Sequence, residues 1–418
     1  MGLIHRRFYF QLSILFMLIA MGLSACGGSS SSSSSGGGST LATPQGLSVS
    51  ARNASVLLDW SEVAGATAYN VYYATDPDID IDNPGSGSGN WDWVSDVTPP
   101  HTLDMLDNGV TYYLVITATD GERESSASDE SSVTPRAGIS GREIRTTTRS
   151  VGSDSYQHTL NGTFCDEGDV VVGGGFRIVS EGDEDAALRI HSSFPTSGGS
   201  GDGRIYNWAG RAYNENDLAE DGIELQTQVI CIDEPDDFER VRNTSLALDA
   251  GVSEVFSSEC TGDNIALTGG AVLTGVNSDD PGIRLAYSQR DADTEAAWQT
   301  TLHNVGIEDH ESIASIVLCA AQLRGLSVET SYAVRPEEFV PAGTFGERSV
   351  VCDAAQSVTH GGPYRQGDAA DQPTDLVLQQ SYPDTDDQGR DVWRVKVYNS
   401  AAEALPMGAF AVCVDSDD

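Results

Sequence analysis

Lysine is almost absent from this sequence. Lys396 is the only lysine among 418 residues, and the 23 basic residues face 63 acidic ones. The formal net charge is therefore −40 at pH 7. A surface this acidic repels phosphate backbones, so the composition excludes nucleic acid as a partner and suits cations better.

The short motifs of common enzyme active sites are also missing. The sequence has no Gly-x-Ser-x-Gly, no His-Glu-x-x-His and no phosphate-binding loop. The seven histidines do not align across the repeats described below, and carboxylates are too numerous for any pair to stand out. We therefore expect no enzyme activity and no cofactor, with a secreted hydrolase as the catalytic alternative.

The first 26 residues have the order of an export signal. A basic stretch at residues 5–7 precedes an apolar run at 8–23, which is rather short for a spanning helix of about 20 residues. The run ends in Leu23-Ser24-Ala25-Cys26, which resembles the lipobox of bacterial lipoproteins. The resemblance implies cleavage before Cys26 and acylation of that cysteine, which would anchor the chain in a lipid bilayer. Gly27 follows, which in Gram-negative members of this family is compatible with the outer membrane.

Residues 27–39 are almost wholly glycine and serine. Such a stretch behaves as a flexible coil and contains no core-forming side chain. It favours a cleaved, lipid-anchored protein over an uncleaved membrane helix, because a tether implies a folded part held away from the bilayer.

From Pro44 onward, short runs of alternating apolar and polar residues are separated by turn residues, which predicts antiparallel strands. The positions that resemble a fibronectin type III domain, in that family's order, are Pro44, Leu47, Trp60, Tyr69, Val71, Leu106, Gly109, Tyr112 and Ala118. The resemblance implies a sandwich with Trp60 in its core. It also implies a hydrogen bond between the Tyr112 hydroxyl and a nearby backbone group.

Two stretches of this domain are candidate binding sites. Asp76, Asp78, Asp80 and Asp82 alternate after the third run, where they form either a solvated acidic loop or a set of oxygen ligands for calcium. The spacing of an EF-hand is missing. The stretch Asn90-Trp91-Asp92-Trp93 offers aromatic rings either to a sugar or peptide or to the edge of the sandwich.

The rest of the chain contains a threefold repeat. Each copy has a Cys-x8-Gly-Gly motif, then Trp-x5-Asn, then a closing cysteine. The recurring residues are Cys165, Gly174-Gly175, Trp208, Asn214 and Cys231; Cys260, Gly269-Gly270, Trp298, Asn304 and Cys319; and Cys352, Gly361-Gly362, Trp393, Asn399 and Cys413. Short apolar runs split by Gly, Asp and Ser clusters predict strands in every unit. A cysteine followed by glycines in three β repeats also resembles threefold β-prism proteins such as vitelline membrane outer layer protein, although the unit here is longer.

Six cysteines allow fifteen pairings, but a repeat predicts the same pairing in each copy. We expect Cys165 with Cys231, Cys260 with Cys319, and Cys352 with Cys413. The alternative joins successive units through Cys231 with Cys260 and Cys319 with Cys352. Exported proteins retain disulfides, and the absence of any Cys-x2-Cys pair disfavours zinc.

Two interpretations fit the recurring residues. In the structural one, the glycines allow close approach of a ring or another backbone, the tryptophan is that ring, and the asparagine closes a turn. In the functional one, each Trp and Asn pair holds a sugar, as in multivalent lectins. The pairs are Trp208 with Asn214, Trp298 with Asn304, and Trp393 with Asn399.

The predicted organisation is a signal peptide (1–25), a lipidated Cys26 with a Gly/Ser linker (26–42), a fibronectin type III domain (43–136) and three β repeats (140–234, 235–322 and 323–418). The predicted fold class is all-β. We predict a membrane-anchored surface lipoprotein that acts as a non-catalytic binding or adhesion module for extracellular glycan or protein. A structural or envelope-assembly lipoprotein without a small ligand is the alternative.

Overall fold

The computed structural model describes residues 40–83, 91–151, 158–162, 164–179, 188–198, 205–214, 223–274, 282–291, 294–332, 335–364 and 375–417. The chain divides into two units, Met1–Thr40 and Leu41–Asp418. The predicted signal and Cys26 lie outside the described residues. Within those residues no helix is long and apolar enough to span a membrane.

The predicted fibronectin type III sandwich is confirmed. One sheet has the order β1-β2-β5, with β1 (Gln45–Arg52), β2 (Ser55–Ser61) and β5 (His101–Asp104). The other has the order β4-β3-β6-β7, with β3 (Ala68–Ala74), β4 (Asp92–Val97), β6 (Tyr112–Thr119) and β7 (Ser131–Val133). Both sheets turn one face inward, so every second side chain enters a shared core.

Two aromatic residues of this core lie where the sequence predicted them. Trp60 on β2 is 5% exposed, and its ring meets the ring of Tyr69 edge-on at 5.3 Å. The backbone N–H of Asp107 donates to the Tyr112 hydroxyl at 3.0 Å, which closes the predicted tyrosine corner. Both residues therefore have structural roles.

Each repeat contains six strands. The first has β8 (Glu143–Val151), β9 (His158–Asn161), β10 (Asp169–Ile178), β11 (Leu188–Gly198), β12 (Ile205–Asn214) and β13 (Ile223–Asp233). The second has β14 (Glu239–Leu248), β15 (Ser253–Glu259), β16 (Ile265–Leu273), β17 (Ile283–Arg290), β18 (Ala297–Asn304) and β19 (His310–Ala320). The third has β20 (Ser327–Tyr332), β21 (Phe345–Val351), β22 (Gln356–Tyr364), β23 (Leu376–Thr385), β24 (Asp391–Asn399) and β25 (Gly408–Asp415), with the short 3-10 helix η3 (Pro336–Glu338) after β20.

The six strands pair in the same way in every repeat. The sixth strand lies between the first and third, as in β8-β13-β10, β14-β19-β16 and β20-β25-β22. The fifth lies between the second and fourth, as in β9-β12-β11, β15-β18-β17 and β21-β24-β23. All of these pairs are antiparallel, which agrees with the predicted all-β class.

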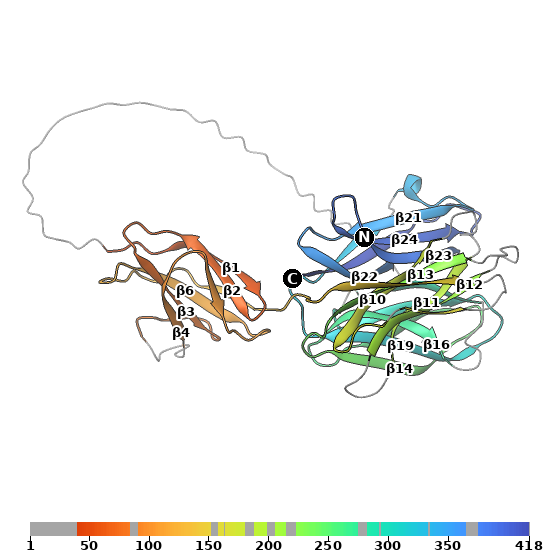
Figure 1. Cartoon of the computed structure of the whole chain (residues 1–418), viewed down its shortest axis with the longest axis horizontal. Helices are drawn as coiled ribbons and strands as arrows, with labels where there is room; N and C mark the ends of the chain where they lie inside the picture. Colours follow the sequence, from red (N-terminus) through yellow and green to blue (C-terminus); the bar gives the residue numbers. More distant parts are fainter. Residues whose placement is uncertain are drawn as a thin grey trace, which may run out of the picture. The chain divides into compact units, whose positions relative to one another are not determined.

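The three repeats interlock in a closed ring. The third strand of each repeat lies beside the fourth strand of the preceding one: β16 beside β11, β22 beside β17, and β10 beside β23. At the last of these junctions two sheets merge into the six-stranded sheet β21-β24-β23-β10-β13-β8 (Figure 1). Because one hydrophobic core contains residues from all three repeats, each copy depends on its neighbours for burial.

The within-repeat disulfide pairing is confirmed. Cys165 bonds to Cys231, Cys260 to Cys319 and Cys352 to Cys413, with Cα atoms 5.6, 5.8 and 5.6 Å apart. Each bond joins the loop before the third strand to the sixth strand. Closing loops of this length contributes roughly 4 kcal/mol each in the chain-entropy account.

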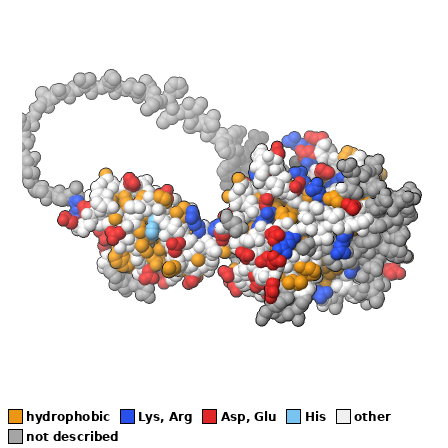
Figure 2. All heavy atoms as spheres, viewed as in Figure 1, with side chains coloured by type: hydrophobic (Ala, Val, Ile, Leu, Met, Phe, Trp, Pro, Cys, Tyr) orange, Lys and Arg blue, Asp and Glu red, His pale blue; other side chains and the backbone are white. Residues whose placement is uncertain are grey.

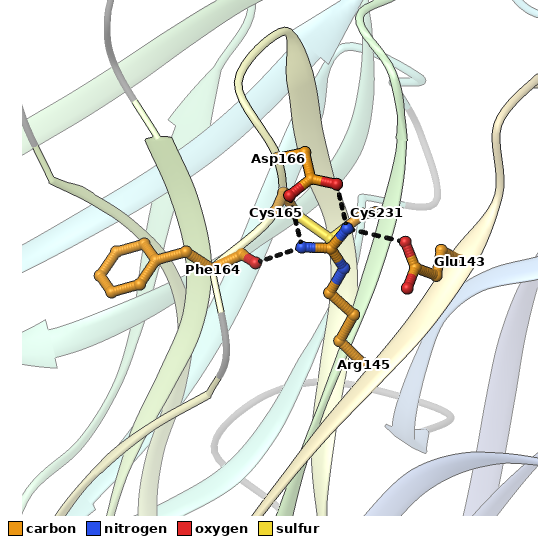
Figure 3. The surroundings of a disulfide bond; sticks show 6 residues. All are labelled: Glu143, Arg145, Phe164, Cys165, Asp166 and Cys231. Atoms are coloured by element: carbon orange, nitrogen blue, oxygen red, sulfur yellow. Dashed lines mark hydrogen bonds and ion pairs between the residues drawn. A yellow bond between two sulfur atoms is a disulfide. The ribbon is translucent and has the colours of Figure 1, made fainter.

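Arg145 forms hydrogen bonds to the loop that contains Cys165 of the first disulfide (Figure 3). Its guanidinium donates to the Phe164 carbonyl oxygen at 2.9 Å and to the Asp166 carboxylate at 3.0 Å, on either side of Cys165. It also bonds Glu143 at 2.8 Å. Arg145 lies on β8, so it ties the loop with Cys165 to the strand next to β13, which carries Cys231.

Candidate functional site

The three repeat tryptophans lie in the protein interior and have no exposed surface: Trp208, Trp298 and Trp393 are each 0% exposed. Each indole N–H donates to a serine hydroxyl on the fourth strand of its own repeat. The acceptors are Ser193, Ser288 and Ser381, at 2.8, 2.8 and 2.9 Å. Since no sugar can reach these rings, the functional interpretation is wrong for the tryptophans and the structural one holds.

The first glycine of each Gly-Gly pair lies against the tryptophan of its own repeat. A Cβ atom would come within 2.3, 2.5 and 2.3 Å of the indole Cγ at Gly174, Gly269 and Gly361. These three glycines are therefore required by the rings, as the structural interpretation predicted.

The second glycine faces the preceding repeat. A Cβ on Gly175 would lie 1.8 Å from the carbonyl oxygen of Ser381, and one on Gly270 would lie 2.3 Å from that of Ser193. At Gly362 the fit is looser, because the nearest atom, on Phe410, would be 3.2 Å away. In each pair the first glycine thus makes room for the tryptophan ring, and the second makes room for the preceding repeat.

The serine that accepts each indole proton is a recurring residue that the sequence did not reveal. Its separation from the tryptophan varies, at 15, 10 and 12 residues in the three copies. A Ser-aromatic-Pro sequence begins at Ser193 and at Ser381, but Ser288 is followed by Gln and Arg. The Ser-aromatic-Pro sequence that could have revealed these serines is therefore present in only two copies.

The repeat asparagines close loops, as predicted. The Asn304 amide donates to the Glu308 carbonyl at 2.8 Å, and its oxygen accepts from the Gly306 N–H at 3.0 Å. Asn399 makes the same two bonds, to the carbonyl of Glu403 and from the N–H of Ala401, at 2.8 and 2.9 Å. The side chain of Asn214 lies outside the described residues.

His360 lies among all three tryptophans. Its ring centroid is 5.2 Å from that of Trp208, 4.8 Å from Trp298 and 5.3 Å from Trp393. Neither ring nitrogen has a hydrogen-bond partner within the described part of the chain. Complete burial lowers the pKa of His360 to about 3, so the ring is neutral at pH 7.

Within the described part of the chain, the four alternating aspartates are not gathered into a group of potential metal ligands. Oδ1 of Asp80 accepts the backbone N–H groups of Asp82 and Asn83, at 3.1 and 3.2 Å, and Oδ2 accepts the Asn83 amide. Asp76, Asp78 and Asp82 are exposed. This arrangement favours the solvated acidic loop.

Among the described residues, the one group of three potential metal ligands is Glu239, Cys260 and Cys319. Both cysteines are consumed by their disulfide, and the carboxylate of Glu239 accepts bonds from Thr261 and Asn264. A disulfide sulfur lacks the thiolate charge that binds metal, so this group is structural.

An exposed aromatic face lies on the sandwich. Trp93 on β4 pairs across strands with Tyr72 on β3, and the two rings stack at 6.2 Å with an angle of 15°. Trp91 meets Tyr72 edge-on at 5.0 Å. Trp93 is 55% exposed whereas Tyr72 is 8% exposed, so the outer ring rests on a buried one. Asn90 lies outside the described residues.

A carboxylate is fixed beside this face. Oε1 of Glu124 accepts the Asn70 amide at 2.8 Å, the Tyr72 hydroxyl at 2.9 Å and the Thr117 hydroxyl. Desolvation acts to raise the pKa of Glu124, but these bonds outweigh it and the pKa is lowered. Burial of the phenol, and to a smaller extent its hydrogen bond to Glu124, raises the pKa of Tyr72 to about 12. The carboxylate is thus ionised at neutral pH, and these three hydrogen bonds use the same oxygen.

Comparisons with known proteins give no assignment. No protein-family model matches the sequence, and no curated protein matches it. Among solved structures, chitinase ChiA74 from Bacillus thuringiensis is 13% identical with a TM-score of 0.18, over 46% of this chain and 26% of that one. A two-domain fibronectin type III segment of chicken tenascin is 16% identical with a TM-score of 0.19, over 46% of this chain and 91% of that one. Scores this low carry no functional argument.

We predict that Gly361→Ala destabilises the protein by about 2 kcal/mol or more, because the added methyl group collides with the Trp393 ring. Gly362→Ala is the matched control and should cost less, since its nearest neighbour is 3.2 Å away. Urea unfolding of residues 40–418 measures both. A larger loss for Gly362→Ala would contradict the ring contact as the reason for the motif.

We predict that His360 makes folding sensitive to acid. Its folded pKa of about 3 lies below the unfolded value of 6.5, so the unfolded state binds more protons between these values. Stability contributed by the neutral ring is complete above pH 6.5 and falls by roughly 1.4 kcal/mol per pH unit on acidification toward pH 3.

The measurement compares unfolding free energies of the wild type and His360→Leu at pH 7 and pH 5, so that contributions from the many carboxylates cancel. The rings around His360 are Trp208, Trp298, Trp393 and Phe410, none of which titrates in this range. Equal pH dependence of the two proteins would exclude His360 as the source.

Proposed function

We propose that this chain is a lipid-anchored, non-catalytic binding protein of the bacterial envelope that holds an extracellular glycan on the sandwich. The observation that carries the proposal is the exposed ring of Trp93 stacked on Tyr72, with the ionised Glu124 fixed nearby. A sugar presents C–H groups on one ring face and hydroxyl donors at its edge. An aromatic plane and a held carboxylate oxygen match those two features.

The charge of the domain supports a neutral glycan. Residues 43–136 contain fifteen acidic residues and three arginines, and acidic side chains are scattered over the visible surface (Figure 2). The negative electrostatic field of these residues repels polyanions but does not act on a neutral sugar. Binding then depends on stacking and hydrogen bonding.

Burial of the repeat tryptophans favours a second candidate function. Without sugar sites at the repeat tryptophans, the ring of three disulfide-bonded repeats suits a structural or envelope-assembly lipoprotein. The two functions differ in the partner: a glycan binds the sandwich directly, whereas an assembly role requires an envelope protein.

For the glycan function we expect Trp93→Ala to weaken binding about tenfold or more, equivalent to roughly 1.4 kcal/mol. A glycan array with residues 40–418 identifies the ligand, and calorimetry then compares the variants. Met105→Ala is the control, because Met105 is 97% exposed on the same domain. Absence of any glycan signal, together with recovery of an envelope protein in pull-downs, would favour the structural role.

For the anchor we expect Cys26→Ser to abolish incorporation of a labelled fatty acid and to leave the precursor uncut. Ser24→Ala is the control, since it keeps a small residue at that lipobox position. Labelling in the producing bacterium, followed by mass spectrometry of the amino terminus, measures both. Persistent labelling of the Cys26→Ser protein would show that the lipid is attached elsewhere.

A further inference from the structure

A polar pocket lies on the third repeat. It has a volume of about 100 Å³ and is formed by strands β21, β24 and β23. Its lining includes Glu347, Ser349, Gln380, Tyr382, Arg394 and Lys396. These residues lie in two cross-strand rows, because Lys396 is opposite Glu347 and Gln380, while Arg394 is opposite Ser349 and Tyr382.

A comparison of the three copies distinguishes residues that the fold requires from residues that it does not require. Trp, Gly-Gly, Ser and the cysteines recur in all three copies because packing requires them. The pocket residues do not recur. At the position of Arg394 the other copies have Ala209 and Gln299, and at that of Lys396 they have Arg211 and Thr301. Since two copies fold without this set, the scaffold does not explain it.

Hydrogen-bond donors predominate in the pocket. The Oε1 atom of Gln380 accepts the backbone N–H of Ile178 at 3.1 Å, which leaves its amide N–H2 as a donor. Burial raises the pKa of Tyr382, so its hydroxyl keeps its proton. Arg394 uses Nε for Asp384, at 2.6 Å, and retains its terminal nitrogens. Lys396 places its ammonium 4.8 Å from the centroid of the Phe345 ring.

The neighbouring repeat holds one wall of the pocket. Arg177 on β10 lies over the Tyr382 ring at 5.4 Å, and Ile178 on the same strand fixes Gln380. This is the junction at which β10 and β23 join in one sheet. Ring closure therefore pre-organises the pocket.

We propose that this pocket binds one uronic acid unit, that is, a sugar that bears a single carboxylate. A carboxylate accepts from the guanidinium, ammonium, phenol and amide donors. The adjacent sugar hydroxyls donate to Glu347, the acceptor at the rim. A peptide rich in carboxylates suits the site less, because the net charge of −40 repels a polyanion whereas one carboxylate meets only the local donors. This site is separate from the Trp93 face.

Because Lys396 is the only lysine, an amine-reactive acetylating reagent reports on the pocket without mutation. The rate of acetylation at Lys396 is measured by mass spectrometry on the full-length chain, with galacturonate, galactose or acetate present. We expect galacturonate to slow acetylation severalfold and the other two compounds to leave it unchanged. Equal protection by galactose would overturn the carboxylate requirement, equal protection by acetate would reduce the site to a general anion site, and no protection would overturn the proposal.

Substitution provides an independent measurement. Lys396→Met keeps the length of the side chain and removes the charge, and we expect about tenfold weaker binding of galacturonate in saturation-transfer NMR titrations. Arg211→Met, at the matching position of the first repeat, is the control and should leave the affinity unchanged. Trp93→Ala should also leave it unchanged, which distinguishes failure of this site from failure of the proposed function. Undiminished affinity of Lys396→Met would contradict the assignment.

Discussion

Each repeat tryptophan packs its ring directly on a glycine backbone, while its indole N–H reaches a serine on the neighbouring strand of its own sheet. The ring occupies the space that a β-carbon would need, so the distance between the two sheets of a repeat is set by this contact. The adjacent glycine allows the preceding repeat to come close in the same way. The Gly-Gly pair thus fixes both the distance between the two sheets of a repeat and the distance between successive repeats. The disulfides hold the loops that lead into the strands with these glycines.

The centre of the ring cannot be fully symmetric. The residue before each Gly-Gly pair is Gly173, Thr268 or His360, and these differ greatly in size. A Cβ on Gly173 would lie 1.8 Å from the carbonyl oxygen of Thr359, so the first copy has no room for a side chain. The His360 ring instead contacts all three tryptophans. Close packing thus admits one large side chain and leaves it without hydrogen-bond partners in the described structure.

The interior repeats itself, whereas the outer surface does not. Core positions are equivalent in the three copies because the same contacts recur. The residues at the positions of Arg394 and Lys396 differ in the other two copies, and the Trp93 face lies on the sandwich. The proposed binding chemistry is therefore carried by residues that the scaffold leaves free to vary.

The sequence by itself determined the strands and the sandwich, because alternation and turn residues are local signals. The exact repeat spacing favoured disulfides within each repeat over disulfides between successive repeats, and the structure decided between these two schemes. The sequence also placed Trp60 and Tyr112 correctly and gave both possible roles of Trp208, Trp298 and Trp393. Only the tertiary structure decided between those roles, since burial depends on which strands face each other. The same holds for the serine partners of the tryptophans and for the closure of the three repeats into a ring, because these contacts join residues at variable separations in the chain. It also holds for Glu124, which is fixed by Asn70, Tyr72 and Thr117. Such contacts follow from how sheets pack, and no spacing in the sequence specifies them.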